Sequence, residues 1–333
     1  MSVKPVVAQP ESTPSLARLV PHSRRRFVAP AIAFAAVLVV VLIGALTTPA
    51  FLTYDNILVI FRQASITGIM ALGMTFITIS GSFFSLSVEQ TAAVSAIVFA
   101  EAMAHGWGLA LSLVATLVVA ALIGAVQGGV ISLGVNPIVT TLAAGSVLYG
   151  LAAMITGNKI VQIRTGSGTW IGQGRPLGIP TQVWAFLILT AIAGIVLRGA
   201  RFGRLVTLVG ANRHAAEASG LRVRWATVAA FVVSAVAAGV AGILVAAQIR
   251  QGLVKQFDGA NIDVIAAVLV GGAAVAGGEG SMVRTALGAM LISVLTNFMI
   301  LRDYSFGVRT AAEGVVVVVA VCTFHLLRRR ELT

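Results

Sequence analysis

Residues 181–248 read TQVWAFLILTAIAGIVLRGARFGRLVTLVGANRHAAEASGLRVRWATVAAFVVSAVAAGVAGILVAAQ. Two apolar runs, 181–198 and 225–248, enclose a loop that carries six arginines and an Ala-rich segment at 212–221. Because an α-helix rises 1.5 Å per residue, about 20 apolar residues cross the roughly 30 Å hydrocarbon core of a bilayer. The pattern therefore predicts two membrane helices joined by a basic loop, in which 212–221 forms a short helix.

The composition of the whole chain agrees with this prediction. The 333 residues are 58% hydrophobic and 10% charged, and the mean hydropathy is +0.99, more apolar than the core of a soluble domain requires. The apolar runs do not alternate with polar residues as those of a membrane β-barrel do, since 37–42 and 315–321 are apolar on every face. We therefore predict an all-α integral membrane protein.

About ten stretches have the length and hydropathy of membrane helices. Spans two to five and seven to ten form two sets of four. If span two is equivalent to span seven, span three to span eight and so on, equivalent spans are five places apart along the chain. Because five is odd, equivalent spans run in opposite directions, as in an inverted repeat; ten unrelated helices remain the alternative. The predicted spans are 28–47, 57–79, 86–104, 108–133, 137–156, 181–198, 225–248, 261–276, 283–301 and 309–327.

The basic residues favour one orientation of these spans. With the N-terminus inside, the cytosolic segments hold fifteen of the 23 lysines and arginines, the outer segments hold seven, and Arg62 lies within a span. Because basic loops stay on the cytosolic side, this orientation is preferred. It places 198–224 and both termini in the cytosol, and 157–180 outside.

Two short tails flank the predicted membrane domain at 27–327. Residues 1–26 contain four prolines, lack a long apolar run and end in three arginines, so we expect a disordered cytosolic tail. A cleaved signal peptide is the competing interpretation, but the apolar run at 27–46 is longer than the apolar part of such a peptide. We expect residues 328–333 to form a second cytosolic tail.

The sequence carries no catalytic motif that we recognise. It has no GxxxxGK[ST] phosphate-binding loop, because Lys4, Lys159 and Lys255 do not follow glycine-rich turns, and it has no HExxH metal motif. A single cysteine, Cys322, excludes a disulfide within the chain. The net charge of +12 comes from short blocks beside the spans, which indicates membrane topology rather than nucleic-acid binding. We expect no enzyme activity and no bound cofactor or metal.

A few polar side chains lie in or beside the predicted spans. An ionisable group at mid-membrane costs about 2.5 to 3.5 kcal/mol on insertion scales, so such residues indicate either a solute pathway or pairing between helices. Glu89 and Glu313 lie only a turn from their span ends, and an ion pair between Arg62 and Glu89 explains two of these residues equally well. The candidate pathway residues are Arg62, Gln63, Ser85, Glu89, Gln90, Asp263 and Asn297.

Several short motifs follow one another as they do in a known family. They are Ala71-Leu-Gly-Met-Thr75, Asn136-Pro-Ile-Val-Thr140, Gly178-Ile-Pro180, Arg201-Phe-Gly-Arg204, Gly210-Ala-Asn212, Ser219-Gly220-Leu221, Asp263-Val-Ile-Ala-Ala-Val268 and Gly277-Gly278-Glu-Gly280-Ser281. Each motif alone is weak, but their order and spacing are specific. On these motifs the chain resembles the permease subunits of bacterial ATP-binding-cassette (ABC) importers, in the branch that takes up ribose, xylose, galactose and related solutes.

The resemblance implies a division of labour in the bacterial inner membrane. Two permeases, identical or paralogous, form the pathway; a cytosolic ATPase hydrolyses ATP and binds their inner loops; and a periplasmic binding protein delivers the solute. In similar proteins the segment matching 212–221 is a coupling helix that docks on the ATPase, with the flanking arginines at the anionic lipid surface. The resemblance carries this role to Asn212, Ala215, Ala216, Glu217, Ser219, Gly220 and Leu221.

One departure from the family pattern follows the second span. The family usually carries Gly-Ile-Asp-Leu-Ser-Val-Gly where this chain has Phe83-Phe-Ser85-Leu-Ser-Val-Glu89. A carboxylate is lost at Ser85 and another is gained at Glu89, which changes the hydrogen bonding near the expected pathway. A sugar is the first expectation for the substrate, and a nucleoside, a polyol or a signalling furanose stays open.

Two other functions remain open. An ion-coupled secondary transporter fits ten spans, an inverted repeat and the carboxylates Glu89 and Glu313, and it would need no ATPase. A scaffold that only recruits partners fits less well, because polar residues and glycine breaks within spans serve no purpose in it.

Overall fold

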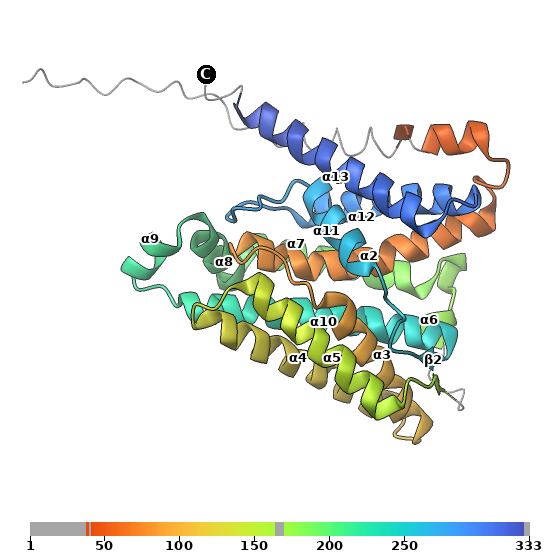
Figure 1. The fold of residues 1–333 in the computed structure, drawn as a ribbon, viewed down its shortest axis with the longest axis horizontal. Coiled ribbons are helices and arrows are strands. Elements are labelled where there is room, and N and C mark those ends of the chain that lie inside the picture. The colour runs from red at the N-terminus through yellow and green to blue at the C-terminus, as the bar shows by residue number, and fades with distance from the viewer. Residues whose placement is uncertain (1–37, 40, 164–169, 330–333) are drawn as a thin grey trace, which may run out of the picture.

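The computed structural model describes residues 38–39, 41–163 and 170–329, which are mostly helical (Figure 1). A two-residue antiparallel strand pair, β1 (Val161–Gln162) with β2 (Gln251–Gly252), and a 3-10 turn η2 (Pro176–Gly178) join the helices at one end. The helices are α2 (Tyr54–Ile79), α3 (Val88–Ala104), α4 (Leu109–Ser132), α5 (Pro137–Thr156), α6 (Trp170–Gln173), α7 (Thr181–Gly199), α8 (Arg201–Ala211), α9 (Arg213–Ala218), α10 (Val223–Ile249), α11 (Ala260–Val270), α12 (Met282–Leu301) and α13 (Phe306–Arg329).

Each predicted span corresponds to a helix over all or part of its described residues, and the eighth differs at one end. Within the described residues, six helices are long and apolar enough to cross a membrane: α2, α4, α5, α7, α10 and α12. Of the first predicted span, residues 38–39 and 41–47 are helical, and its beginning lies outside the described residues. The predicted tail at 1–26 and residues 330–333 also lie outside them.

The eighth predicted span is wrong at its C-terminal end. Helix α11 stops at Val270, and residues 271–281 form turns instead of continuing to residue 276. Gly272, Gly277 and Gly278 have φ angles of 72°, 92° and 79°, which a right-handed helix does not accommodate. The small apolar residues between these glycines extended the hydropathy signal past the point where the backbone turns.

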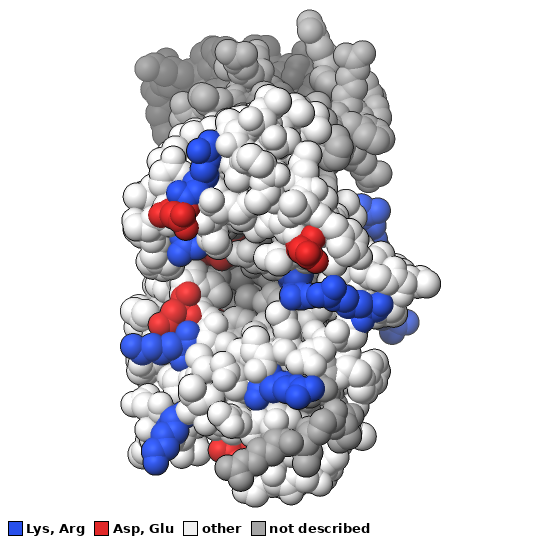
Figure 2. All heavy atoms as spheres, turned by 90° about the vertical axis from the view of Figure 1, so that its right-hand side faces the viewer, with Lys and Arg blue, Asp and Glu red and all other residues white. Residues whose placement is uncertain are grey.

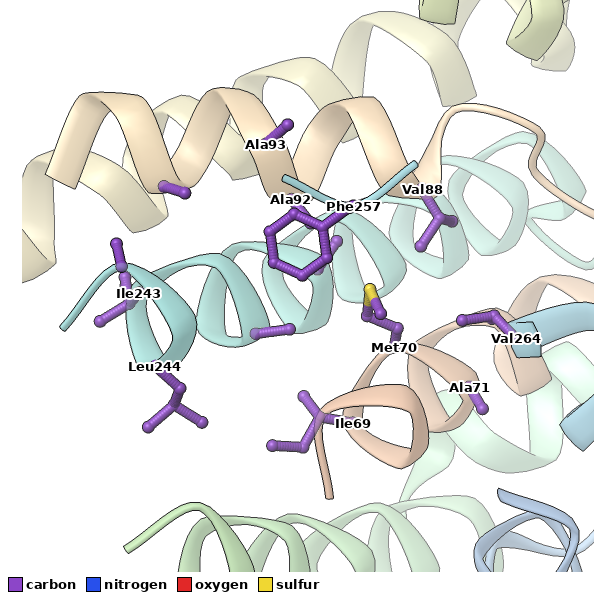
Figure 3. Close-up of a cluster of buried hydrophobic side chains, with 14 of the residues drawn as sticks. Ile69, Met70, Ala71, Val88, Ala92, Ala93, Ile243, Leu244, Phe257 and Val264 are labelled. Atoms are coloured by element: carbon purple, nitrogen blue, oxygen red, sulfur yellow. The ribbon is translucent and has the colours of Figure 1, made fainter. Parts of the chain in front are cut away.

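Helices α2 and α10 form the centre of the bundle. In their most apolar windows 67% and 56% of residues are buried, against 17% in α5 and 11% in α7, which lie at the periphery. Figure 3 shows Met70 of α2 beside Val88 and Ala92 of α3, with Val264 of α11 close by. Alanines dominate this core, and small residues let membrane helices approach closely.

The helix contacts fall into matched sets. Helix α2 packs on α12 as α10 packs on α4, and α2 and α10 also pack on each other. Helix α3 contacts α4 and α5, just as α11 contacts α12 and α13. The contacts among these eight helices therefore form matched pairs.

The two ends of the bundle differ in structure. Helices α8 and α9 project at the left end in Figure 1, whereas α6 and β2 lie at the right end. The long helices run between these ends. Segments from both halves of the chain, 79–82 and 276–281, reach the end that carries α8.

Candidate functional site

Helix α8 is an amphipathic helix that lies on the bundle. Gly203, Val206 and Val209, which recur at a spacing of three, are buried, while Arg201 and Arg204 are exposed. The guanidinium of Arg204 donates a 2.9 Å hydrogen bond to the carbonyl oxygen of Gly199, the last residue of α7. The exposed arginines of the basic loop therefore surround a helix whose other face is fixed to the protein.

Helix α9 is capped at both ends. The Asn212 Oδ1 accepts a 3.0 Å hydrogen bond from the Ala215 backbone N–H, as an N-cap residue does. At the other end Leu221 N–H donates to Ala216 O and Gly220 N–H donates to Glu217 O, both at 3.0 Å. Gly220 has a φ of 72°, so this is a Schellman motif closed by glycine. The predicted short helix with its stop at Gly220 is present.

The two faces of this short segment have different surroundings. Ala216 is 5% exposed and packs with Val206, Val223 and Ala226 of the neighbouring helices. Leu221 is half-buried against the same cluster. The remaining residues proposed for coupling, Asn212, Ala215, Glu217, Ser219 and Gly220, are exposed. A partner that docks here therefore meets these five residues, while Ala216 and Leu221 fix the segment to the bundle.

Three backbone segments meet beside α9 without side chains between them. Gly278 N–H donates a 2.8 Å hydrogen bond to the carbonyl oxygen of Ile79 at the end of α2. A Cβ on Gly277 would lie 2.7 Å from the Gly81 Cα and 2.8 Å from the Gly210 carbonyl oxygen. We call this contact of Gly81, Gly210, Gly277 and Gly278 the glycine junction. It joins the end of α8 to α2 and to the turn before α12.

The residues around the family departure lie where α3 begins. Ser85 is buried, and its hydroxyl is 3.0 Å from that of Ser87, which donates to Gln127 Oε1 at 2.9 Å. Glu89 Oε2 accepts from the Asn261 N–H at 3.2 Å, and Glu89 Oε1 accepts from Gln90 Nε2 at 2.7 Å. Asn261 lies in the first turn of α11 and was not among the predicted residues.

The other candidate pathway residues do not join this group. Arg62 interacts with Arg175 electrostatically, and its Nε has no hydrogen-bond partner. The hydrogen bonds of Glu89 go elsewhere, so the predicted pair of Arg62 with Glu89 is not formed. Asn297 is buried and exchanges two amide hydrogen bonds with Asn56, at 3.0 and 2.9 Å. Gln63 is half-buried on α2.

Two carboxyl groups, those of Asp263 on α11 and Glu313 on α13, lie close together. Glu313, 4% exposed, accepts a 2.7 Å hydrogen bond from the Thr296 hydroxyl of α12. The carboxyl of Asp263, which is partly buried on α11, lies close to that of Glu313.

Comparisons with known proteins give the family. A family model described as "Branched-chain amino acid transport system / permease component" matches residues 56–322. The chain belongs to this family. It is therefore a multi-pass protein of the inner membrane with a transport role rather than a catalytic one, and the resemblance found from the motifs is confirmed.

Named relatives of this permease match over most of its length. The ribose import permease protein RbsC of Haemophilus influenzae is 30% identical over 314 residues, which cover 92% of this chain and 96% of the relative. The Escherichia coli RbsC is 32% identical over 291 residues, 86% and 90% of the two chains. The L-arabinose transport system permease protein AraH of E. coli is 29% identical over 278 residues, which cover 83% of this chain and 84% of AraH. No solved structure matches the chain.

The face of the permease opposite α8 and α9 carries charges of both signs. Figure 2 shows lysines, arginines and acidic residues scattered around a hollow near its middle. Exposed charged residues of the loops at this end are Asp55, Lys159, Arg175, Arg250, Lys255, Asp258, Arg302 and Asp303. The two ends of the permease therefore present different surfaces: a capped helix flanked by arginines at one, and a hollowed surface of mixed charge at the other.

Proposed function

We propose that this permease is the membrane-spanning subunit of an ABC importer for a sugar or a similar small polar solute. The relatives named for ribose and L-arabinose, which match more than four fifths of the chain, favour a sugar. A separate cytosolic ATPase hydrolyses ATP, and a periplasmic protein delivers the solute to the mixed-charge face. This chain binds no cofactor itself. A second permease, identical or paralogous, completes the pathway.

The position of α9 is the observation that supports this proposal most directly. Its exposed face is free to bind a partner, while Ala216 and the caps hold it to α8 and α10. The glycine junction then connects the end of α8 to α2 and α12 through backbone contacts. Because no flexible side chain lies between these segments, a displacement of α9 is passed on as a rigid-body movement of the long helices.

The proposed topology has ten spans with both termini in the cytosol. The matched contacts of α2–α5 and α10–α13 support an inverted repeat, in which α2 corresponds to α10 and α3 to α11. In this arrangement the α9 end faces the cytosol, where arginines are favoured, and the loop at 157–180 faces the periplasm.

The alternative is an ion-coupled secondary transporter, and one observation favours it. The carboxyls of Asp263 and Glu313 lie close together on two helices of the second set, and a proton-coupled carrier requires carboxyl groups within the membrane. Such a carrier would move solute down an ion gradient in liposomes that contain no ATPase.

The test compares one substitution at the two ends of the permease. Ala215→Glu introduces charge and bulk on the exposed face of α9, and Ala104→Glu introduces the same side chain at the exposed end of α3, on the opposite side of the proposed membrane. With the cognate ATPase co-expressed, we expect Ala215→Glu to reduce the ATPase retained on tagged permease at least about tenfold, because the docking face is blocked. Ala104→Glu should retain it fully.

Two outcomes would contradict the proposal. If Ala215→Glu retains the ATPase as well as Ala104→Glu does, α9 is not the docking site. If the wild-type permease alone accumulates solute in liposomes under an ion gradient, the secondary transporter is correct.

A further inference from the structure

Helices α3 and α11 meet at their N-termini through a reciprocal contact. Glu89 N–H donates to the side-chain Oδ1 of Asn261, and Asn261 N–H donates to the side-chain Oε2 of Glu89, both at 3.2 Å. Each residue is the second of its helix, since α3 begins at Val88 and α11 at Ala260. Each side chain thus caps the helix of the other.

This contact takes the place of ordinary capping. The N-cap residues, Ser87 of α3 and Gly259 of α11, make no side-chain cap hydrogen bond. The first backbone N–H groups of a helix lack partners within the helix and carry a partial positive charge, so two N-termini that face each other repel. The Glu89 carboxylate lies between them and is attracted to both.

Further hydrogen bonds fix the orientation of both side chains. Gln90 Nε2 donates to Glu89 Oε1 at 2.7 Å, and Asn261 Nδ2 donates to the Leu86 carbonyl oxygen at 2.8 Å. Both carboxylate oxygens of Glu89 are therefore engaged within the protein. The residues that accompany the pair, Val88 of α3 and Val264 of α11, are buried in the core shown in Figure 3.

The pair links α3 and α11 directly. Helix α3 belongs to α2–α5 and α11 to α10–α13, and the two helices touch little apart from this pair. Each packs extensively on other helices, α3 on α10 and α4, and α11 on α12 and α2. Three hydrogen bonds, two between Glu89 and Asn261 and one from Asn261 to Leu86, therefore connect the start of α3 directly to α11.

We propose that Glu89 and Asn261 are a positioning pair that holds the N-termini of α3 and α11 together during transport. The transport part of this inference rests on the proposed function. Because its oxygens are engaged, Glu89 acts through helix spacing and not as a ligand of the solute. Where the family usually has glycine, no side chain is present to make this contact, so the pair distinguishes this permease from the general pattern.

The first experiment is a double-mutant cycle on the purified permease. Glu89→Ala and Asn261→Ala should each lower the midpoint of thermal unfolding by about 3 to 8 °C, because a hydrogen bond to a charged group is lost and a helix end is left uncapped. The unfolding midpoint of the double variant should be no lower than that of either single variant, because each single substitution already removes the same contact. Glu101→Gln, which neutralises an exposed carboxylate on the other end of α3, is the control and should leave the midpoint unchanged.

Additive losses in the double variant would show that the residues do not act as a pair and would overturn the inference. Glu89→Gln keeps an amide oxygen that accepts from Asn261 N–H, so its unfolding midpoint should fall less than that of Glu89→Ala. It replaces Glu89→Ala in the cycle if the alanine variant does not fold. The cycle needs no ATPase, so its result does not depend on the proposed function.

The second experiment tests the role in transport with the complete complex in liposomes. The readout is the ratio of ATP hydrolysis with the binding protein and solute to hydrolysis without them. We expect Glu89→Ala and Asn261→Ala to lower this ratio by about fivefold or more, because the N-termini of α3 and α11 are no longer held together. Glu89→Gln should lower it less, and Glu101→Gln should preserve it. If the ratio of ATP hydrolysis is unchanged in variants that lose thermal stability, the pair only stabilises the fold, and the positioning role is overturned. A failure of every variant and of the wild type to bind an ATPase would instead contradict the proposed function.

Discussion

The glycine junction and the Glu89–Asn261 pair both join separate parts of the chain, but they do so with different atoms. At the junction, backbone packs directly on backbone, with one hydrogen bond and no side chain that can change rotamer. At the N-termini of α3 and α11, half-buried side chains make the connection. The comparison teaches that backbone packing fixes the permease beside the proposed ATPase-docking helix, whereas side-chain hydrogen bonds link the N-termini of α3 and α11.

The largest effect is expected where a methyl group is added to the junction. Gly210→Ala should destabilise the permease by about 3 kcal/mol or more, because the new Cβ would overlap the Ile79 carbonyl oxygen. Helix propensity alone predicts the opposite sign, since alanine is favoured over glycine by about 1 kcal/mol within a helix. Thermal unfolding of the purified permease measures the difference.

Gly194→Ala in α7 is the matched control for this substitution. A Cβ there meets no atom within 4 Å, so we expect an unchanged or slightly higher unfolding midpoint. If Gly210→Ala behaved like Gly194→Ala, the junction would be looser than the backbone contacts indicate, and the contrast with the Glu89–Asn261 pair would disappear.

A smaller effect is expected when α9 loses its N-cap. Asn212→Ala should cost about 1 kcal/mol of stability, because the Ala215 N–H loses its acceptor. It should also reduce the ATPase retained by the permease, because the docking segment frays.

Asn136→Ala removes an equivalent cap from α5, where the Asn136 Oδ1 accepts from Ile138 N–H at 2.9 Å. It should cost similar stability and leave ATPase retention unchanged. Equal retention by the two variants would show that order in α9 does not matter for docking.

The sequence predicted the local features of this fold better than the distant ones. The short helix at 212–221 was predicted because its signals, an alanine-rich run and Gly220, lie within ten residues of one another. Most span ends were predicted for the same reason. The contact of Glu89 with Asn261 joins residues 172 positions apart, and no local sequence pattern predicts it. Charge alone suggested Arg62 as the partner of Glu89, but helix positions decide which groups meet.

The sequence likewise did not predict which residues of α9 are exposed and which are buried. Ala215 and Ala216 are identical in kind and adjacent, yet one is exposed and the other is buried among Val206, Val223 and Ala226. Only the packing of α8 and α10 on α9 separates a residue that is able to touch a partner from one that anchors the helix.

The smallest effect on stability is expected at the exposed ion pair of α9. Arg213 Nε lies 3.3 Å from Glu217 Oε1, four residues away on the same helix, and both side chains are about half exposed. Such pairs contribute about 0.3 to 0.5 kcal/mol and weaken with added salt, so Glu217→Ala should barely change the unfolding midpoint. If the variant nevertheless binds the ATPase several-fold more weakly at low salt, Glu217 contacts the ATPase rather than only Arg213. If binding is unchanged at every salt concentration, the docking surface is confined to the uncharged residues of α9, and the rigid attachment of α9 to the bundle matters more than its charge.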